Sequence, residues 1–203
     1  MQQPFFITAS CLIAKAAAFK NGVKLFEAPG MNAADFLDEL YKHLELAYPK
    51  FHKMDGLSKL GLLATDILLK NSGHEEKYRE NETGLILSNA NSSLDVDMKY
   101  AKTIKTGASP ALFVYTLPNI VIGEISIRHR FKGENAFFVF KHFNGNFIAD
   151  YVNGLLNSGL IQCCICGWID FLEEEYSARL MLVEKTKSGL SIPFTASNIN
   201  QLK

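Results

Sequence analysis

Two short apolar runs most constrain what this chain can fold into. Residues 83–89 (TGLILSN) and 160–169 (LIQCCICGWI) are nearly continuous in apolar side chains and are bounded by turn-forming residues. Such runs are typical of strands buried on both faces, because a solvent-facing side would place polar residues at alternate positions. Segments with helical periodicity lie before and between them. The runs therefore predict a sheet that is covered by helices.

Helical periodicity is clearest in residues 34–46 and 54–69, where apolar side chains recur every three or four positions. Asn32 is expected to cap the first helix, and Gly73 to stop the second. Further helices are predicted at 92–105, 109–122, 123–131 and 146–157, and further strands at 5–14, 23–26, 136–140 and 177–184.

The connections complete the predicted layout. Asn21-Gly22 predicts a tight turn in an opening hairpin formed by residues 5–14 and 23–26. The charged run 74–82 is expected to be an exposed loop, and Ser92-Ser93 a turn with a helix cap. Because strands alternate with helices and no repeat or linker interrupts them, we predict one domain over residues 1–203. Its fold class is a layered α/β sandwich with a mixed, mostly parallel sheet.

Composition and charge narrow the class of protein. The 203 residues are 48% apolar, and 21 Lys and Arg balance 21 Asp and Glu. A neutral chain gathers no phosphate groups over a whole face, which argues against a nucleic-acid partner. The first apolar run lacks a preceding basic segment and is broken by Ser10, Cys11 and Lys15 before it reaches the length of a membrane span. We expect a cytoplasmic protein that works in a complex and needs no cofactor.

The cysteines and most histidines are predicted to be structural. Cys163, Cys164 and Cys166 share one strand, where adjacent disulfides are geometrically unfavourable and zinc-ligand spacing is absent. With Cys11 they are expected to be reduced, packed thiols, with Cys164 and Cys166 on one face and Cys163 on the other, and no metal is expected. Four histidines are expected to be solvated: His43, His52, His74 and His129.

The segment from Ser109 to Gly133 carries the most specific pattern. Ser109-Pro110 is followed by Pro118-Asn119, then by Gly123, by Ser126-Ile127 and finally by Gly133. This order resembles the run that leads to the nucleophile of β-ketoacyl synthases, the condensing enzymes of fatty-acid and polyketide assembly, which have a thiolase-like fold. The resemblance implies one half of a thiolase fold.

The resemblance extends over most of the chain in the same order. Met54-Asp55 and the helix after it look like the family's Met-Asp helix, and residues 84–93 look like its strand and Gly/Ser loop. Residues 161–170 and 180–184 resemble two later strands, with Glu184-Lys185 in place of a Glu-Arg pair. Only the N-terminal half of a two-half ketosynthase is represented.

The residue that performs the family's chemistry is missing. The nucleophilic cysteine of a ketosynthase sits at a helix N-terminus, where the helix dipole favours the thiolate, and two histidines from the second half assist it. Here that position falls at or beside Lys141 and His142, and no cysteine lies between Gly133 and Gly159. The resemblance therefore implies no catalytic residue, although His142 remains open as an acyl-carbonyl ligand or as a surface residue.

A ketosynthase relative without its nucleophile suggests a chain-length-factor-like subunit. Such a subunit pairs with an active β-ketoacyl synthase in fatty-acid or polyketide assembly, as in aryl-polyene pathways, and meets acyl carrier protein through the complex. The family's tunnel helix corresponds here to residues 111–122, and it gives four acyl-pocket candidates, Phe113, Tyr115, Thr116 and Ile120, for which ordinary core packing is the alternative. Strand 136–140 is too apolar for an open sheet edge, so the predicted interface residues are Phe137, Phe138, Val139 and Phe140.

Two other functions remain open from sequence. A divergent acyltransferase or condensing enzyme would use Cys164, Cys166 or His142 in a rearranged site. A homodimeric acyl-binding or carrier-protein-binding module would assemble without a second kind of subunit. Thiol reactivity at neutral pH tests the first alternative, and native mass tests the second.

Overall fold

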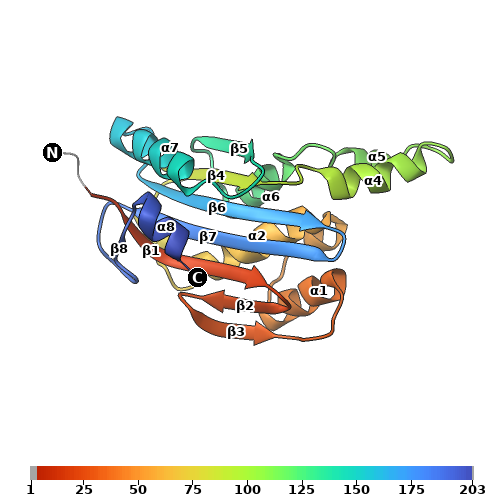
Figure 1. Ribbon diagram of the computed structural model, residues 1–203, viewed down its shortest axis with the longest axis horizontal. Coiled ribbons are helices and arrows are strands. Elements are labelled where there is room, and N and C mark those ends of the chain that lie inside the picture. The colour runs from red at the N-terminus through yellow and green to blue at the C-terminus, as the bar shows by residue number, and fades with distance from the viewer. Residues whose placement is uncertain (1–3, 203) are drawn as a thin grey trace.

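The computed structural model describes residues 4–202, and these residues form a single sheet with helices on both faces (Figure 1). The strands are β1 (Phe6–Ala14), β2 (Ala17–Lys20), β3 (Val23–Glu27), β4 (Thr83–Asn89), β5 (Asn135–Val139), β6 (Cys163–Leu172), β7 (Glu175–Glu184) and β8 (Ile192–Pro193). The helices are α1 (Ala33–His43), η1 (Pro49–Lys53), α2 (Gly56–Leu69), α3 (His74–Lys77), α4 (Leu94–Thr103), α5 (Pro110–Phe113), α6 (Ile120–His129), α7 (Gly145–Ser158) and α8 (Ala196–Gln201).

The sheet has the order β3-β2-β1-β7-β6-β4-β5, with β8 paired to β1 beside this path. It is mixed, as the sequence predicts. The expectation that it is mostly parallel is wrong, because among the described strands only β4 makes parallel pairs, with β5 and with β6. The first three strands form an antiparallel meander, and β6 and β7 form a long hairpin.

The first part of the chain forms three strands, β1 to β3, instead of the predicted two-stranded hairpin. Asn21 and Gly22 both have positive φ and form the predicted turn, but they connect β2 to β3. β2 pairs with β1 through a turn in which Lys15 and Ala16 also have positive φ. Neither residue is a usual turn former, so the sequence gives little sign of this first turn.

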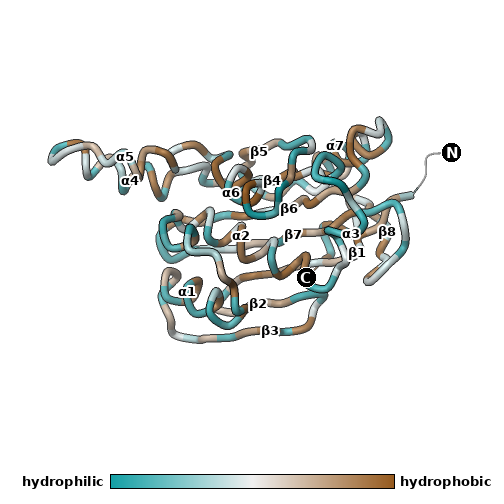
Figure 2. Tube along the Cα trace, turned by 180° about the vertical axis from the view of Figure 1, so that it is seen from behind, coloured by the Kyte–Doolittle hydropathy of each residue, from teal (hydrophilic) through white to brown (hydrophobic). Residues whose placement is uncertain are grey.

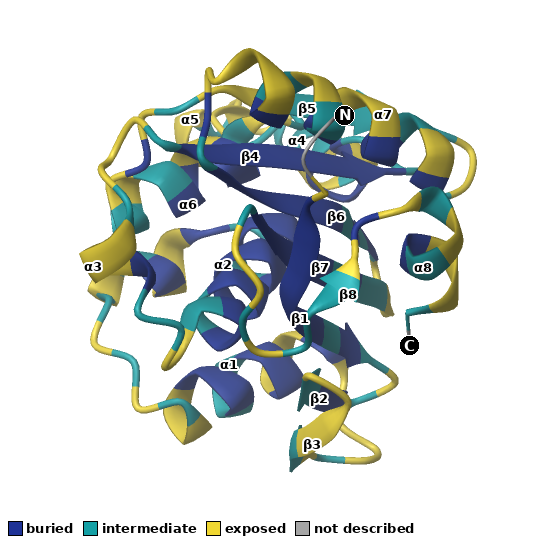
Figure 3. Ribbon diagram, turned by 90° about the vertical axis from the view of Figure 1, so that its left-hand side faces the viewer, coloured by how far each residue is buried: buried dark blue, intermediate teal, exposed yellow. Residues whose placement is uncertain are grey.

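One face of the sheet is covered by α1, α2 and α6. α2 lies against β1, β6 and β7 and packs along α6, and all its leucines except the partly buried Leu69 are buried in the larger hydrophobic core. Asn32 caps α1 by accepting a hydrogen bond from the Asp35 backbone N–H, and Asp55 caps α2 through Ser58. Figure 3 shows these helices with their buried sides toward the sheet and exposed residues outward.

The opposite face is covered by α7 and the C-terminal α8, which pack on each other. α7 buries Ile148, Val152 and Leu156 against β6 and β7, in agreement with a predicted helix over 146–157. Tyr151 is exposed, because the core-facing positions at that turn are Ile148 and Val152. No helix within residues 4–202 is long and apolar enough to cross a membrane.

Two predicted segments need correction. Residues 74–82 are not simply a loop, since they begin with the short helix α3, and the His74 side chain is buried. The helices expected at 109–122 and 123–131 divide elsewhere: α5 ends at Phe113, and α6 begins after Pro118 and runs through Gly123. Pro118 lies in the turn between α5 and α6, whereas a single glycine is tolerated inside α6.

The segment from α4 to α5 extends from one end of the sheet as an arm (Figure 1), and the same projection is seen from behind (Figure 2). The two ends of the arm are tied together at its base. Ser93 Oγ lies 3.1 Å from the Thr116 carbonyl oxygen and 3.0 Å from Asp97 Oδ2, and its one hydroxyl proton can be donated to either acceptor. The arm is therefore held at its base while its outer part stands away from the core.

Candidate functional site

The connection from β5 to α7 occupies the position where the resemblance places a nucleophile. Lys141 and His142 lie in this connection, and both side chains are exposed. Phe143 packs on the sheet, 6.2 Å from the Trp168 ring and beneath the Arg179 guanidinium. Asn144 caps α7 by accepting a hydrogen bond from the Phe147 backbone N–H at 3.0 Å. The N-terminus of α7 is thus satisfied by an amide side chain, with no thiol beside it.

The first turn of α7 is also in contact with the C-terminal helix. Gly145 is buried, and a methyl group at its α-carbon would collide with the side-chain oxygen of Asn200 on α8. A larger residue here would require the Asn200 side chain to move. α8 therefore lies directly on the helix terminus that would bear a nucleophile.

The three cysteines of β6 lie in the interior. Their side chains are fully buried, and the predicted alternation is confirmed: Cys164 and Cys166 face α7 and α8, whereas Cys163 faces α3. Burial raises the pKa of Cys163 to about 12 and raises that of Cys164 well above its usual range. Cys163 and Cys164 are therefore protonated at neutral pH, and none of the three thiols meets solvent.

Cys163 has a histidine neighbour that the sequence did not predict to be buried. The Cys163 sulfur lies 3.6 Å from His74 Nε2 and 3.5 Å from Thr83 Oγ1, and His74 Nε2 lies 3.0 Å from Thr83 Oγ1. Burial lowers the pKa of His74 to about 4, so the imidazole is neutral at pH 7. A protonated thiol beside a neutral imidazole lacks the thiolate–imidazolium character of a cysteine nucleophile.

The four acyl-pocket candidates lie at the base of the arm and differ in environment. Phe113 is 59% exposed, at the end of α5. Thr116 donates its hydroxyl to the Phe113 carbonyl oxygen at 2.7 Å, and Ile120 is half-buried at the start of α6. Tyr115 packs against the larger core, and its hydroxyl donates to Glu124 Oε1 at 3.1 Å. Phe113 is therefore the candidate most available to a second molecule.

Glu124 is a buried carboxylate that sequence reasoning missed. It lies on α6, and its Oε2 forms an ion pair with Lys50 Nζ at 2.6 Å. Together with desolvation, the Glu124 carboxylate raises the pKa of the Tyr115 hydroxyl. An acidic residue inside the otherwise apolar stretch IVIGEISI was the available signal. The contact fixes the end of the arm against α6.

The predicted interface residues lie on an edge strand. β5 pairs only with β4, so its outer side has no partner strand among the described residues. Phe137 packs toward the larger core and Phe138 toward α7, which confirms apolar side chains on both faces. Val139 is 51% exposed, and Phe140 follows it at the end of the strand. An open edge of this composition is a template for pairing.

Two residues of α7 enlarge this apolar edge. Phe147 lies 4.7 Å from Phe138 and 5.1 Å from Phe140, and Tyr151 lies 5.1 Å from Phe138, all measured between ring centroids. These are edge-to-face contacts, which favour a fixed arrangement of the rings. Phe147 is partly buried against the core of this face, whereas Tyr151 is exposed. We call the surface formed by Val139 and the rings of Phe138, Phe140, Phe147 and Tyr151 the aromatic edge.

Comparison with known proteins places the fold. No protein-family model and no curated protein matches the chain. One matching solved structure is titled the ishigamide ketosynthase/chain length factor. The match covers 94% of this chain and 64% of the matched chain, with a TM-score of 0.67 and 18% identity. A type II polyketide ketosynthase in complex with its acyl carrier protein, bound to a hexaketide, matches 91% and 63%, with a TM-score of 0.62 and 14% identity.

A third match is a complex of a ketosynthase (ApeO) and its chain length factor (ApeC) from Xenorhabdus doucetiae. It covers 98% of this chain and 90% of the matched chain, with a TM-score of 0.61 and 11% identity. The chain thus has the fold of ketosynthase and chain-length-factor proteins, as the sequence resemblance implies. It spans less than two thirds of the first two matched chains, but nearly the whole length of the third.

Proposed function

We propose that this chain is a non-catalytic ketosynthase-like subunit that pairs with an active β-ketoacyl synthase and shapes its acyl pocket. One observation carries the proposal: apolar side chains stand exposed along the aromatic edge and arm, while every thiol is buried. A condensing enzyme needs a reachable nucleophile, whereas a pocket-shaping subunit needs only a surface. The matched structures include a ketosynthase with its chain length factor.

The aromatic edge is the proposed contact with the partner. The unpaired N–H and C=O groups on the outer side of β5 bind a strand of the partner, and Val139 is covered by it. Aromatic side chains beside the strand add buried apolar area at the centre of the contact, where binding energy concentrates. A second copy of this chain is the competing occupant, and the experiment below separates the two.

The arm is proposed to reach over the partner's acyl site. Its exposed apolar side chains, Ile104, Phe113, Val114 and Leu117, are between half and two thirds exposed. In the complex, Phe113 would end the space open to the growing acyl chain. Since each buried methylene contributes about 0.8 kcal/mol, a ring at that point selects chain length by occupying volume. Acyl carrier protein would deliver substrate to the active subunit rather than to this chain.

Co-expression with a candidate ketosynthase tests pairing. We expect a stable one-to-one complex by native mass spectrometry, and ketoacyl products from acyl- and malonyl-carrier proteins only when the ketosynthase is present. A homodimer that leaves the ketosynthase free would favour the self-assembling alternative. Condensation by this chain alone would overturn the proposal.

Product length tests the proposed role of Phe113. With the complex formed, Phe113→Ala is expected to lengthen the acyl product and Phe113→Trp to shorten it. Tyr115→Phe keeps a ring at the neighbouring position and removes only the hydrogen bond to Glu124, so its product should keep the parental length. If both Phe113 variants gave products of the parental length, Phe113 would not line the acyl pocket.

A further inference from the structure

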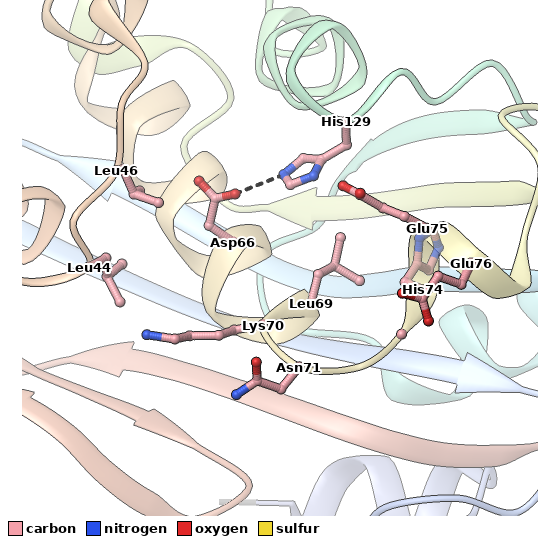
Figure 4. A pocket seen from close by; sticks show the side chains of 11 residues that line it. Leu44, Leu46, Asp66, Leu69, Lys70, Asn71, His74, Glu75, Glu76 and His129 are labelled. Atoms are coloured by element: carbon pink, nitrogen blue, oxygen red, sulfur yellow. Dashed lines mark ion pairs between the residues drawn. The ribbon is translucent and has the colours of Figure 1, made fainter.

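A cavity on the opposite side of the body from the arm has a polar group with unmet hydrogen-bonding capacity. It measures about 420 Å³ and lies between the end of α2, the short α3 and the end of α6 (Figure 4). Its volume is in the range of small-molecule sites. Leu44, Leu46 and Leu69 line one part of it, and Asp66, Glu75 and His129 line another.

Asp66 is the central polar group of this cavity. Its side chain is 90% buried, since only 10% is exposed. Oδ1 lies 3.2 Å from His129 Nε2, and Oδ2 lies 3.4 Å from Arg128 Nε. Neither contact has hydrogen-bond geometry, so Asp66 Oδ2, Arg128 Nε and His129 Nε2 are buried without hydrogen-bond partners. A buried carboxylate oxygen in this state is costly unless another donor binds it.

The charges around the cavity favour a singly charged cation. Asp66, Glu75 and Glu76 contribute three negative charges, whereas Lys70 contributes one positive charge. Arg128, which lines the adjoining cavity, pairs with Asp66 from the side. His74 is neutral at pH 7, since burial lowers its pKa to about 4. Apart from His129, these groups leave one negative charge for a ligand to balance.

The arrangement of donors and acceptors further narrows the chemical class of the ligand. Asp66 Oδ2 requires a donor, and the Glu75 side chain extends toward His129 across the cavity (Figure 4), so a second acceptor lies on the same side. A primary ammonium carries three donors and can serve both carboxylates. Within residues 4–202 no three His, Cys, Asp or Glu side chains are placed to hold a metal ion, so the geometry does not suit a metal.

We propose that this cavity binds a small primary amine with an apolar body. The ammonium donates to Asp66 Oδ2 and toward Glu75, and the carbon chain lies along Leu44, Leu46 and Leu69. Binding displaces water from the leucines and satisfies the buried carboxylate. The site is separate from the aromatic edge and the arm, so it does not depend on the function proposed above.

Three probes with the same six-carbon body test the proposal: n-hexylamine, 1-hexanol and hexanoate. Titrated into the ¹⁵N-labelled protein at pH 7, n-hexylamine is expected to shift the backbone amide signals of Leu69, Gly73 and Glu75 saturably. It should do so at a concentration at least about tenfold lower than 1-hexanol, because it adds a charge-assisted hydrogen bond. Hexanoate should leave these signals unchanged. Equal responses to all three probes, or none, would overturn the proposal.

Matched variants locate the ammonium. Asp66→Asn is expected to weaken n-hexylamine binding roughly 10- to 100-fold and to leave 1-hexanol binding unchanged. Asp150→Asn, the same change at an exposed position on α7, should bind n-hexylamine as the parent does. If Asp66→Asn does not fold, Glu75→Gln is the second variant, and roughly threefold to tenfold weaker binding is expected. If the measured variant, Asp66→Asn or its substitute Glu75→Gln, bound n-hexylamine with the parental affinity, the ammonium would not lie at these carboxylates.

Discussion

The middle of the sheet buries its reactive groups, whereas the β5 edge leaves an apolar side chain exposed. On β6, three thiols are fully buried, and desolvation raises the pKa values of Cys163 and Cys164. At the β5 edge, Val139 is half exposed, and Phe138 and Phe140 lie on a strand whose outer edge has no partner among the described residues. Ordinarily an apolar group is buried and a catalytic group is reachable. The reversal favours a protein that acts by association.

The largest expected effect is on the rate of thiol labelling, compared between the folded and the unfolded protein. In the native protein at pH 7.5, we expect iodoacetamide to label the β6 cysteines more than about 1,000-fold more slowly than in the unfolded chain, since solvent does not reach these buried thiols. Mass spectrometry of the four cysteine peptides, with and without denaturant, measures the ratio. Rapid native labelling of Cys164 or Cys166 would revive the catalytic alternative.

A charge placed on the β5 edge tests the other region. Val139→Asp is expected to weaken the complex with a ketosynthase roughly 100-fold, because the contact would bury an unpaired carboxylate. Val23→Asp is the matched control: it makes the same change at an exposed position of β3, the strand at the opposite edge of the sheet. Biolayer interferometry with immobilised ketosynthase gives both affinities. Equal losses in the two variants would mean that β5 is not the contact.

The fold was largely predictable because local signals and burial agree in it. The continuous apolar runs became β4 and β6 in the centre of the sheet, and the three-to-four periodicity became α1, α2 and α7. The errors fall where tertiary contacts decide. Residues Lys15 and Ala16 adopt positive φ to start β2, and His74 is buried by its contacts with Thr83 and Cys163.

The candidate site was predictable only in part. The missing nucleophile is a property of the sequence, and the apolar β5 was read from FFVF. In contrast, the contact between Gly145 and Asn200 joins residues 55 positions apart, and the ion pair between Lys50 and Glu124 joins residues 74 apart. No local pattern encodes such pairs. The cavity at Asp66 likewise depends on how α2, α3 and α6 meet.

Two glycines from the same sequence pattern are expected to respond in opposite directions. A methyl group at Gly133 would meet the backbone carbonyl of Thr83 at the start of β4, so Gly133→Ala should lower the free energy of unfolding by about 3 kcal/mol. Gly123 is exposed within α6 with open space around its α-carbon, so Gly123→Ala should raise it by about 0.5–1 kcal/mol. Urea denaturation followed by circular dichroism measures both. Similar losses in both variants would contradict the assigned contacts.

The pH dependence of stability tests whether the interior beside Cys163 is as closed as the β6 thiols suggest. Burial lowers the pKa of His74 from its usual 6.5 to about 4, so between these values the unfolded chain binds more protons than the folded one. The stabilisation is therefore complete above pH 6.5 and is lost as the pH falls toward 4, by an amount on the order of 2 kcal/mol. Chemical denaturation at a series of pH values measures the change. His74→Gln should flatten the profile in this window, whereas His142→Gln, at an exposed position, should leave it as in the parent. A His74→Gln protein that loses stability as steeply as the parent below pH 6.5 would show that another group causes the loss, and would contradict the lowered pKa of His74.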